Sequence, residues 1–72
     1  MHERIVIDPE VCGGRPVVEG TRMRVVDVLA ALAAGVEIDE FLADFPYITR
    51  EDVLACLAYG ASAVDHSIVR AA

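Results

Sequence analysis

Glycine and proline residues divide this chain into an N-terminal part that permits short strands and a C-terminal part that permits helices. Proline interrupts helices and central strands, and glycine favours turns. Five of these residues fall before residue 21 and three are spread over the rest: Pro9, Gly13, Gly14, Pro16 and Gly20, then Gly35, Pro46 and Gly60. We therefore expect one domain over residues 1–72, with a short β region at 4–25, a helical core at 26–66 and a tail at 67–72.

The N-terminal part predicts short β-strands. Residues 4–8 are mostly β-branched and stop at Pro9, which is typical of a strand. Residues 17–25 contain two further β-prone runs around Gly20, which favours a hairpin with this glycine in its turn. A small sheet is therefore expected to precede the helices.

Helical periodicity begins near Val26. Apolar residues recur three and four positions apart as far as Gly35, which is placed to end this first helix. A second apolar stripe covers residues 38–45 and stops before Pro46, because the residue before a proline disfavours helical geometry. The sequence thus predicts two short helices in succession.

The third predicted helix has the clearest start. Thr49 is placed as its N-cap, and Asp52, three residues later, completes a capping-box pattern. Ile48 and Val53 are placed to pack together as a hydrophobic staple. The third helix is therefore expected to begin at Thr49.

The second and third helices, with the turn at 46–48 between them, match a helix-turn-helix in outline. The third helix either ends near Gly60, because glycine costs about 1 kcal/mol relative to alanine in a helix, or continues to about Val64. The predicted fold class is α+β and mostly α, with short N-terminal strands or a hairpin before a three-helix, helix-turn-helix core.

Hydrophobic residues make up 56% of the chain, which is more than so small a domain can readily bury. Some apolar side chains are therefore expected to contact another chain, either in a homodimer or higher oligomer or in a complex with a different protein. The side chains assigned to this contact lie along the third helix: Val53, Leu57, Tyr59, Val64 and Ile68. The alternative is that the excess is mostly alanine, which helix surfaces tolerate.

The net charge of −6 belongs entirely to residues 25–72, because the arginines and acids of residues 1–24 cancel. The chain contains no lysine. Such a surface repels phosphate backbones, whereas proteins that bind nucleic acid usually carry a basic stripe. The charge therefore disfavours DNA or RNA as the main partner.

Arginines near the N-terminus keep a second interpretation open. Arg15, Arg22 and Arg24 lie close in sequence, and the last two would share one face of the predicted hairpin. Paired strands can enter the major groove of DNA, and arginine binds guanine edges and phosphates. Arg50 lies at the start of the third helix, which is the usual recognition helix of a helix-turn-helix. Two acids follow it directly, and they would repel phosphate. The alternative is that these arginines pair with the chain's own acids or with an acidic partner.

No arrangement of residues predicts catalysis, a cofactor or a metal site. The soft ligands His2, Cys12, Cys56 and His66 lack the paired spacing of a structural zinc site. Cys12 stands beside two glycines, with neither the base nor the orienting group that a nucleophilic cysteine needs. No run approaches the ~18 apolar residues of a membrane span, and no signal peptide is recognisable. We therefore expect a cytoplasmic protein with reduced thiols.

Three segments carry a family resemblance: residues 14–22, which read Gly-Arg-Pro-Val-Val-Glu-Gly-Thr-Arg, residues 25–35 and residues 44–54. Over most of the chain they resemble domain-of-unknown-function family 433. The resemblance implies a homeodomain-like three-helix fold after a small β region. It also implies an antitoxin-like role in bacteria or archaea, often beside a PIN-like ribonuclease toxin, and it supplies no catalytic residue.

Two residues depart from the usual pattern of that family. Arg24 stands where proline is common, which predicts that strand pairing continues further along this chain. Glu37 stands where serine is common, which predicts a weakly capped start of the second helix. Neither departure argues against membership.

Two functional hypotheses follow. The first is a non-enzymatic antitoxin of a type II toxin–antitoxin pair, which binds and neutralises a PIN-like ribonuclease toxin. The second is a transcriptional autoregulator that binds DNA through Arg15, Arg22 and Arg24 or through the helix-turn-helix. The first hypothesis needs a surface for protein, and the second needs exposed cations that face phosphate.

Overall fold

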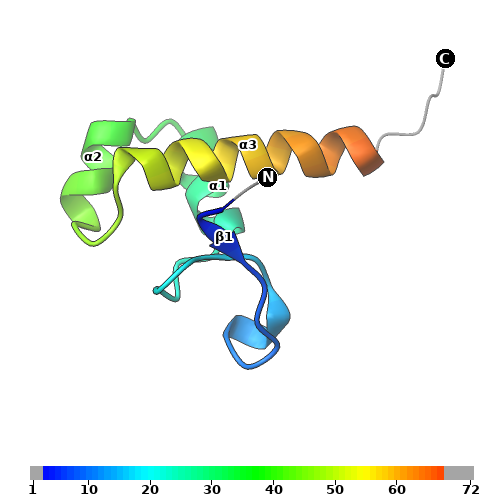
Figure 1. The fold of residues 1–72 in the computed structure, drawn as a ribbon. Helices are drawn as coiled ribbons and strands as arrows, with labels where there is room; N and C mark the ends of the chain where they lie inside the picture. Colours follow the sequence, from blue (N-terminus) through cyan, green and yellow to red (C-terminus); the bar gives the residue numbers. More distant parts are fainter. Residues whose placement is uncertain (1–2, 68–72) are drawn as a thin grey trace, which may run out of the picture.

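The computed structural model describes residues 3–67, which form two short strands followed by three helices (Figure 1). The elements are β1 (Ile5–Val6), the 3-10 turn η1 (Cys12–Gly14), β2 (Val17–Val18), α1 (Val25–Ala33), α2 (Ile38–Asp44) and α3 (Arg50–Ser67). Figure 1 shows α2 beside the N-terminal end of α3, with α1 and β1 near its middle, while the last turns of α3 extend past the other elements. The predicted α+β, mostly α, class is confirmed.

The two strands pair antiparallel, with Ile5 opposite Val18 and Val6 opposite Val17. β1 covers two residues only, so the strand expected over residues 4–8 is shorter than predicted. Its partner is equally short and fully buried. The sheet is therefore a single pair of short strands and does not form a separate layer of the fold.

A turn directly after β1 explains its early end. The backbone carbonyl of Asp8 accepts the N–H of Val11 at 2.9 Å, and the Asp8 carboxylate accepts the N–H of Glu10 at 2.9 Å. Cys12 then has a left-handed φ of 51°, and its thiol donates to the carbonyl of Arg22 at 3.5 Å. These local bonds replace strand pairing beyond Val6.

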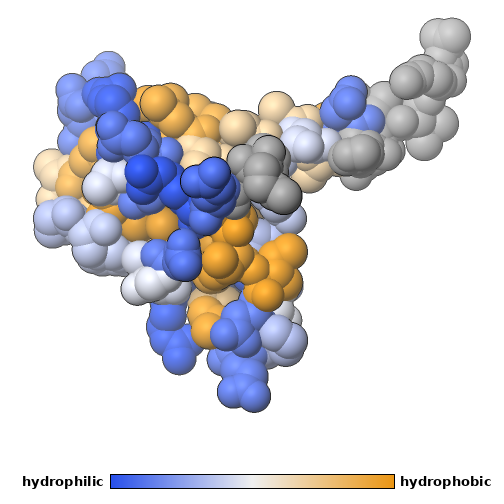
Figure 2. All heavy atoms as spheres, viewed as in Figure 1, coloured by the Kyte–Doolittle hydropathy of each residue, from blue (hydrophilic) through white to orange (hydrophobic). Residues whose placement is uncertain are grey.

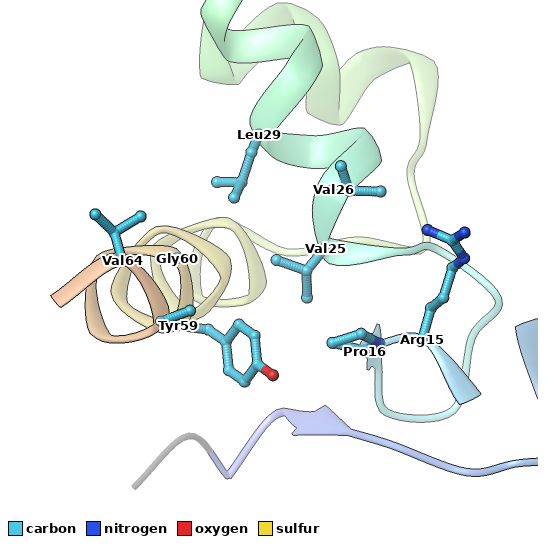
Figure 3. Close-up of a pocket in the computed structure, with 9 residues that line it drawn as sticks. Arg15, Pro16, Val25, Val26, Leu29, Tyr59, Gly60 and Val64 are labelled. Atoms are coloured by element: carbon cyan, nitrogen blue, oxygen red, sulfur yellow. The ribbon is translucent and has the colours of Figure 1, made fainter. Parts of the chain in front are cut away.

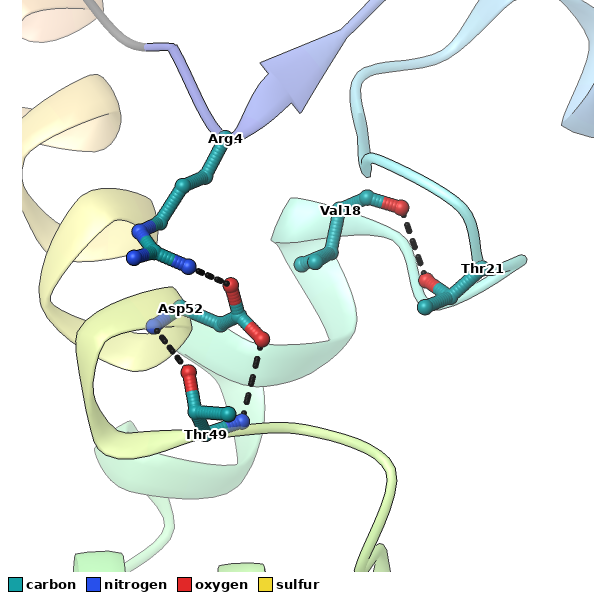
Figure 4. A network of polar contacts seen from close by, with 5 residues as sticks. All are labelled: Arg4, Val18, Thr21, Thr49 and Asp52. Carbon is teal, nitrogen blue, oxygen red and sulfur yellow. Dashed lines mark hydrogen bonds and ion pairs between the residues drawn. The ribbon is translucent and has the colours of Figure 1, made fainter.

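The predicted hairpin over residues 17–25 is confirmed at its turn. Gly20 has a φ of 80°, which favours glycine, and the N–H of Val18 donates to the carbonyl of Met23 at 2.9 Å. The hydroxyl of Thr21 donates to the carbonyl of Val18 at 2.8 Å (Figure 4) and accepts the N–H of Met23 at 2.9 Å. The side chain of Thr21 therefore stabilises the turn through hydrogen bonds to the backbone on both sides of it.

The second half of the hairpin is an isolated bridge rather than a strand. Arg24 pairs with Val17, so pairing does reach this position, as its departure from the family pattern predicts. The next residue, Val25, is already the first of α1. Arg24 therefore forms this one bridge and Arg22 precedes it, instead of both lining the extended strand that was expected.

The end of α1 and the start of α2 agree with the sequence-based predictions. Gly35 has a φ of 99° after α1, its N–H donates to the carbonyl of Leu32 at 3.0 Å, and Val36 donates to Ala31 at 3.1 Å. This pair of bonds is the Schellman motif that glycine supports. Glu37 stands at the N-cap of α2 and makes no side-chain cap bond, which confirms the weak start.

The predicted capping box at the start of α3 is confirmed (Figure 4). The carboxylate of Asp52 accepts the N–H of Thr49 at 3.0 Å, and the hydroxyl of Thr49 accepts the N–H of Asp52 at 3.1 Å. The other carboxylate oxygen of Asp52 accepts from the guanidinium of Arg4 at 3.2 Å. One buried acid thus caps α3 and ties it to the segment before β1.

The third helix does not end at Gly60 but continues past Val64 to Ser67. A Cβ atom at Gly60 would lie 2.8 Å from Cδ1 of Leu29 on α1. The glycine therefore serves the close approach of α1 and α3, and it costs helix propensity without ending the helix. Sequence alone left open whether the helix ends at this glycine or continues to about Val64.

A single cluster of buried apolar residues joins β2, all three helices and the turns beside them. Its members are Val18, Met23, Val25, Val28, Phe41, Ile48, Val53 and Cys56. Ile48 and Val53, the expected staple pair, both belong to it. Val53 has no exposed surface, so its assignment to an intermolecular contact is wrong: it faces the core of its own chain.

Candidate functional site

An apolar groove of about 270 Å³ opens between α1 and α3 (Figure 3). Figure 3 shows Arg15 and Val64 on opposite sides of this groove, with Leu29 of α1 between them. Its lining comes from the segment before α1, from α1 and from the second half of α3: Arg15, Pro16, Val25, Val26, Leu29, Tyr59, Gly60, Ala63 and Val64. Gly60 lies in the α3 wall of this groove, where Leu29 of α1 packs against it.

A second, shallower hollow continues this groove along α3. It is lined by Leu29, Leu57, Gly60, Ala61, Val64 and Asp65, so the two hollows share Leu29, Gly60 and Val64. We call their combined apolar part the α1–α3 surface, made of Val26, Leu29, Leu57, Gly60, Ala61 and Val64. Val26 is 51% exposed, Leu57 39% and Val64 56%. Large aliphatic side chains are therefore exposed to water, and burying them against another chain would be favourable.

The α1–α3 surface forms because α3 is apolar on two faces. Val53 and Cys56 point into the core, whereas Leu57, Ala61 and Val64 recur at intervals of four and three on an exposed stripe. That spacing keeps side chains on one side of a helix. Figure 2 shows hydrophobic residues along the exposed edge of α3 and around β1, with hydrophilic residues between them. A helix with two apolar faces is typical of a helix packed on both sides.

Two charged residues stand at the edges of the α1–α3 surface. Arg15 lines the groove, and Asp65 lines the second hollow next to Val64. Both are exposed, and neither forms an ion pair with another side chain among residues 3–65. The surface therefore carries a positive charge on one side and a negative charge on the other.

Three of the five residues predicted for an intermolecular contact line these hollows. Leu57, Tyr59 and Val64 do so, Val53 does not, and Ile68 lies outside the described residues. The contribution of α1, through Val26 and Leu29, was not predicted. The signal for it was Gly60, because a glycine within a long apolar helix often marks the close approach of another element.

The four arginines considered as contacts for DNA or an acidic partner differ in their surroundings. Arg24 makes two hydrogen bonds of 2.9 and 3.1 Å to the carboxylate of Asp27, and this hydrogen bonding and charge raise the pKa of Arg24. Arg50 donates to Asp39 at 2.7 Å. Arg15 and Arg22 are exposed and form no ion pair within residues 3–67. Two of the four candidate arginines thus already hold carboxylates of their own chain.

Acids that remain unpaired gather on α2 and at the start of α3. They are exposed and form no ion pair within the described part of the chain: Glu37, Glu40, Asp44 and Glu51. Two further acids of this region, Asp39 and Asp52, are held by Arg50 and Arg4. We call this set of four unpaired residues the acidic face.

The cysteines are free, and they differ in environment. Cys56 is fully buried, and this burial, together with the negative charge of Asp52, raises the pKa of its thiol to about 11. Cys12 is partly exposed in η1. Within residues 3–67 no three His, Cys, Asp or Glu side chains gather where they could bind a metal ion. In the same range no helix combines the length and the apolar character needed to cross a membrane.

Comparison with known proteins agrees with this fold. A crystal structure of a DUF433 member protein from Anabaena variabilis ATCC 29413 superimposes with a TM-score of 0.81 at 33% identity, covering 88% of this chain and 62% of that one. An uncharacterised protein of Sinorhizobium fredii (strain NBRC 101917 / NGR234), y4eO, is 37% identical over 57 residues, which are 79% of this chain but 26% of that protein. The chain thus spans about a quarter of this curated relative. Residues 5–60 match the family model described as a protein of unknown function, DUF433, and the chain therefore belongs to the DUF433 family.

Proposed function

We propose that this chain is a non-enzymatic antitoxin that binds a PIN-like ribonuclease toxin and neutralises it. The observation that carries the proposal is the acidic face, because its four acids are exposed and form no ion pair within the described part of the chain. The exposed aliphatic side chains Val26, Leu57 and Val64 of the α1–α3 surface indicate in addition that the chain works bound to protein. The working form of the chain is therefore a protein complex, which we place in the cytoplasm.

The distribution of charge supports protein rather than nucleic acid as the partner. The acidic face repels phosphate, and it suits a nuclease whose binding site is built to hold RNA or metal ions. An acidic protein surface competes with RNA for such a site. The antitoxin-like role implied by the family resemblance fits this charge.

The test combines the purified chain with the nuclease encoded beside it in the genome. Cleavage of a labelled RNA is measured with increasing amounts of the chain, at low and at high salt. We expect inhibition that reaches completion near one equivalent and weakens at high salt, because exposed charges are screened. Full nuclease activity with no complex at either salt concentration would overturn the proposal.

The alternative of a DNA-binding autoregulator has less support. Arg24 and Arg50 are engaged by Asp27 and Asp39, which leaves Arg15 and Arg22 as the candidate cations without such a partner within residues 3–67. A gel shift with promoter DNA tests it: binding at low salt that is lost on R22A would support the regulator.

A further inference from the structure

We propose that the α1–α3 surface is the contact between two copies of this chain, related by a twofold axis. The inference shares with the proposed function the premise that this surface binds protein. It differs in naming the bound protein, which is a second copy of the chain. A twofold contact needs a surface that is complementary to itself. The α1–α3 surface offers both an apolar groove and, at its edge on α3, the exposed side chains of Leu57 and Val64.

Charge gives the stronger argument for a second copy. Among the residues that line the two hollows, Arg15 and Asp65 are the charged ones, and they lie on different sides of the apolar area. A twofold axis that runs between them places Arg15 against the partner's Asp65 and Asp65 against the partner's Arg15. Both ion pairs form at the rim, while apolar side chains meet in the centre.

This arrangement also keeps the net charge of −6 per chain out of the contact. The acidic face belongs to α2 and the start of α3, away from the hollows that Val26, Leu29 and Val64 line. Two copies can therefore bury their apolar surfaces without bringing these acids together. In the dimer both acidic faces stay available for a nuclease.

Charge reversal tests the pairing directly. Sedimentation equilibrium is measured for the wild type, R15D, D65R and the double variant R15D/D65R, with circular dichroism to confirm that each is folded. We expect a wild-type dimer, at least about a tenfold weaker dimer for each single variant, and recovery in the double variant. R22D is the matched control, because Arg22 is also exposed and without an ion pair among residues 3–67 but lines neither of the two hollows. It should dimerise like the wild type.

A wild-type chain that stays monomeric up to about 1 mM would overturn the inference. So would a double variant that dimerises no better than the single ones, because another partner or geometry must then cover the surface. The nuclease assay is read separately. A monomer that still inhibits the nuclease overturns the dimer and leaves the antitoxin proposal standing, whereas a dimer without inhibition does the reverse.

Discussion

Asp52 connects more parts of this small protein than any other side chain described above. Its carboxylate binds the N–H of Thr49 and the guanidinium of Arg4, and its own N–H donates to the Thr49 hydroxyl. Its side chain is 10% exposed, whereas Asp39, the acid that binds Arg50, is 86% exposed. Water therefore competes much less for Asp52 than for Asp39.

Replacing Asp52 with alanine is expected to lower the free energy of unfolding by about 2 kcal/mol, since the N–H of Thr49 loses its acceptor and α3 its cap. Urea unfolding at neutral pH measures this change. The matched control is D39A, which removes an exposed ion pair and should cost no more than about 0.5 kcal/mol. Similar losses for the two variants would show that burial of the Asp52 network does not matter.

The thiol of Cys56 predicts a dependence of stability on alkaline pH. Burial and the charge of Asp52 raise its pKa to about 11, from 9.0 for an unperturbed thiol. The folded chain therefore holds this proton more tightly than the unfolded chain. The stabilisation is complete below pH 9.0 and is lost as the pH rises through about 11.

Urea unfolding between about pH 8 and pH 11 should show this loss, and C56A should reduce it. Both tyrosines are present in both proteins, so the difference between the two pH profiles isolates Cys56. C12A, which removes the other thiol and leaves Cys56 in place, is measured beside it. Parallel profiles for the wild type and C56A would contradict the raised pKa.

At the scale of elements, the crossing of α1 and α3 balances two effects at Gly60. Alanine there gains about 1 kcal/mol of helix propensity. Its Cβ would lie 2.8 Å from Cδ1 of Leu29, so that side chain must move. Because Leu29 is only partly buried at the groove, it can rotate, at the cost of its contacts in the crossing.

A double-mutant cycle separates these effects. We expect G60A to change the free energy of unfolding by less than about 0.5 kcal/mol in the wild type, because propensity and crowding oppose each other. In the L29A background the crowding is absent, and the same substitution should stabilise by about 1 kcal/mol. Thermal or urea unfolding of the four proteins gives the coupling. Equal effects in both backgrounds would mean that Leu29 does not limit the crossing.

The end of α1 and the start of α3 could be predicted from the sequence because their signals are local. Thr49 and Asp52 meet across one turn, and Gly35 closes its helix with bonds to the turn before it. Which face of α3 meets the core depends on residues far away in sequence, so Val53 was assigned to the wrong side. For the same reason the part of α1 in the groove was missed. The apolar periodicity of α3 predicted a helix, but not that it has two apolar faces.

At the scale of the whole molecule, apolar and acidic areas occupy different parts of the surface. The α1–α3 surface carries one charge of each sign at its edges, whereas the acidic face carries four exposed acids. Separate areas permit self-association and nuclease binding at the same time. They also permit substitutions that alter one area without the other.

Neutralising the acidic face is expected to slow association with the nuclease about tenfold and to flatten its dependence on salt, because electrostatic attraction speeds the encounter of proteins. The variant replaces the four acids with their amides: E37Q, E40Q, D44N and E51Q. Its control removes equally many negative charges from the N-terminal segment: E3Q, D8N, E10Q and E19Q. Stopped-flow binding at two salt concentrations compares them. If the position of the charge matters, association slows strongly for the first variant only. Equal slowing of association in both variants would mean that net charge alone attracts the partner.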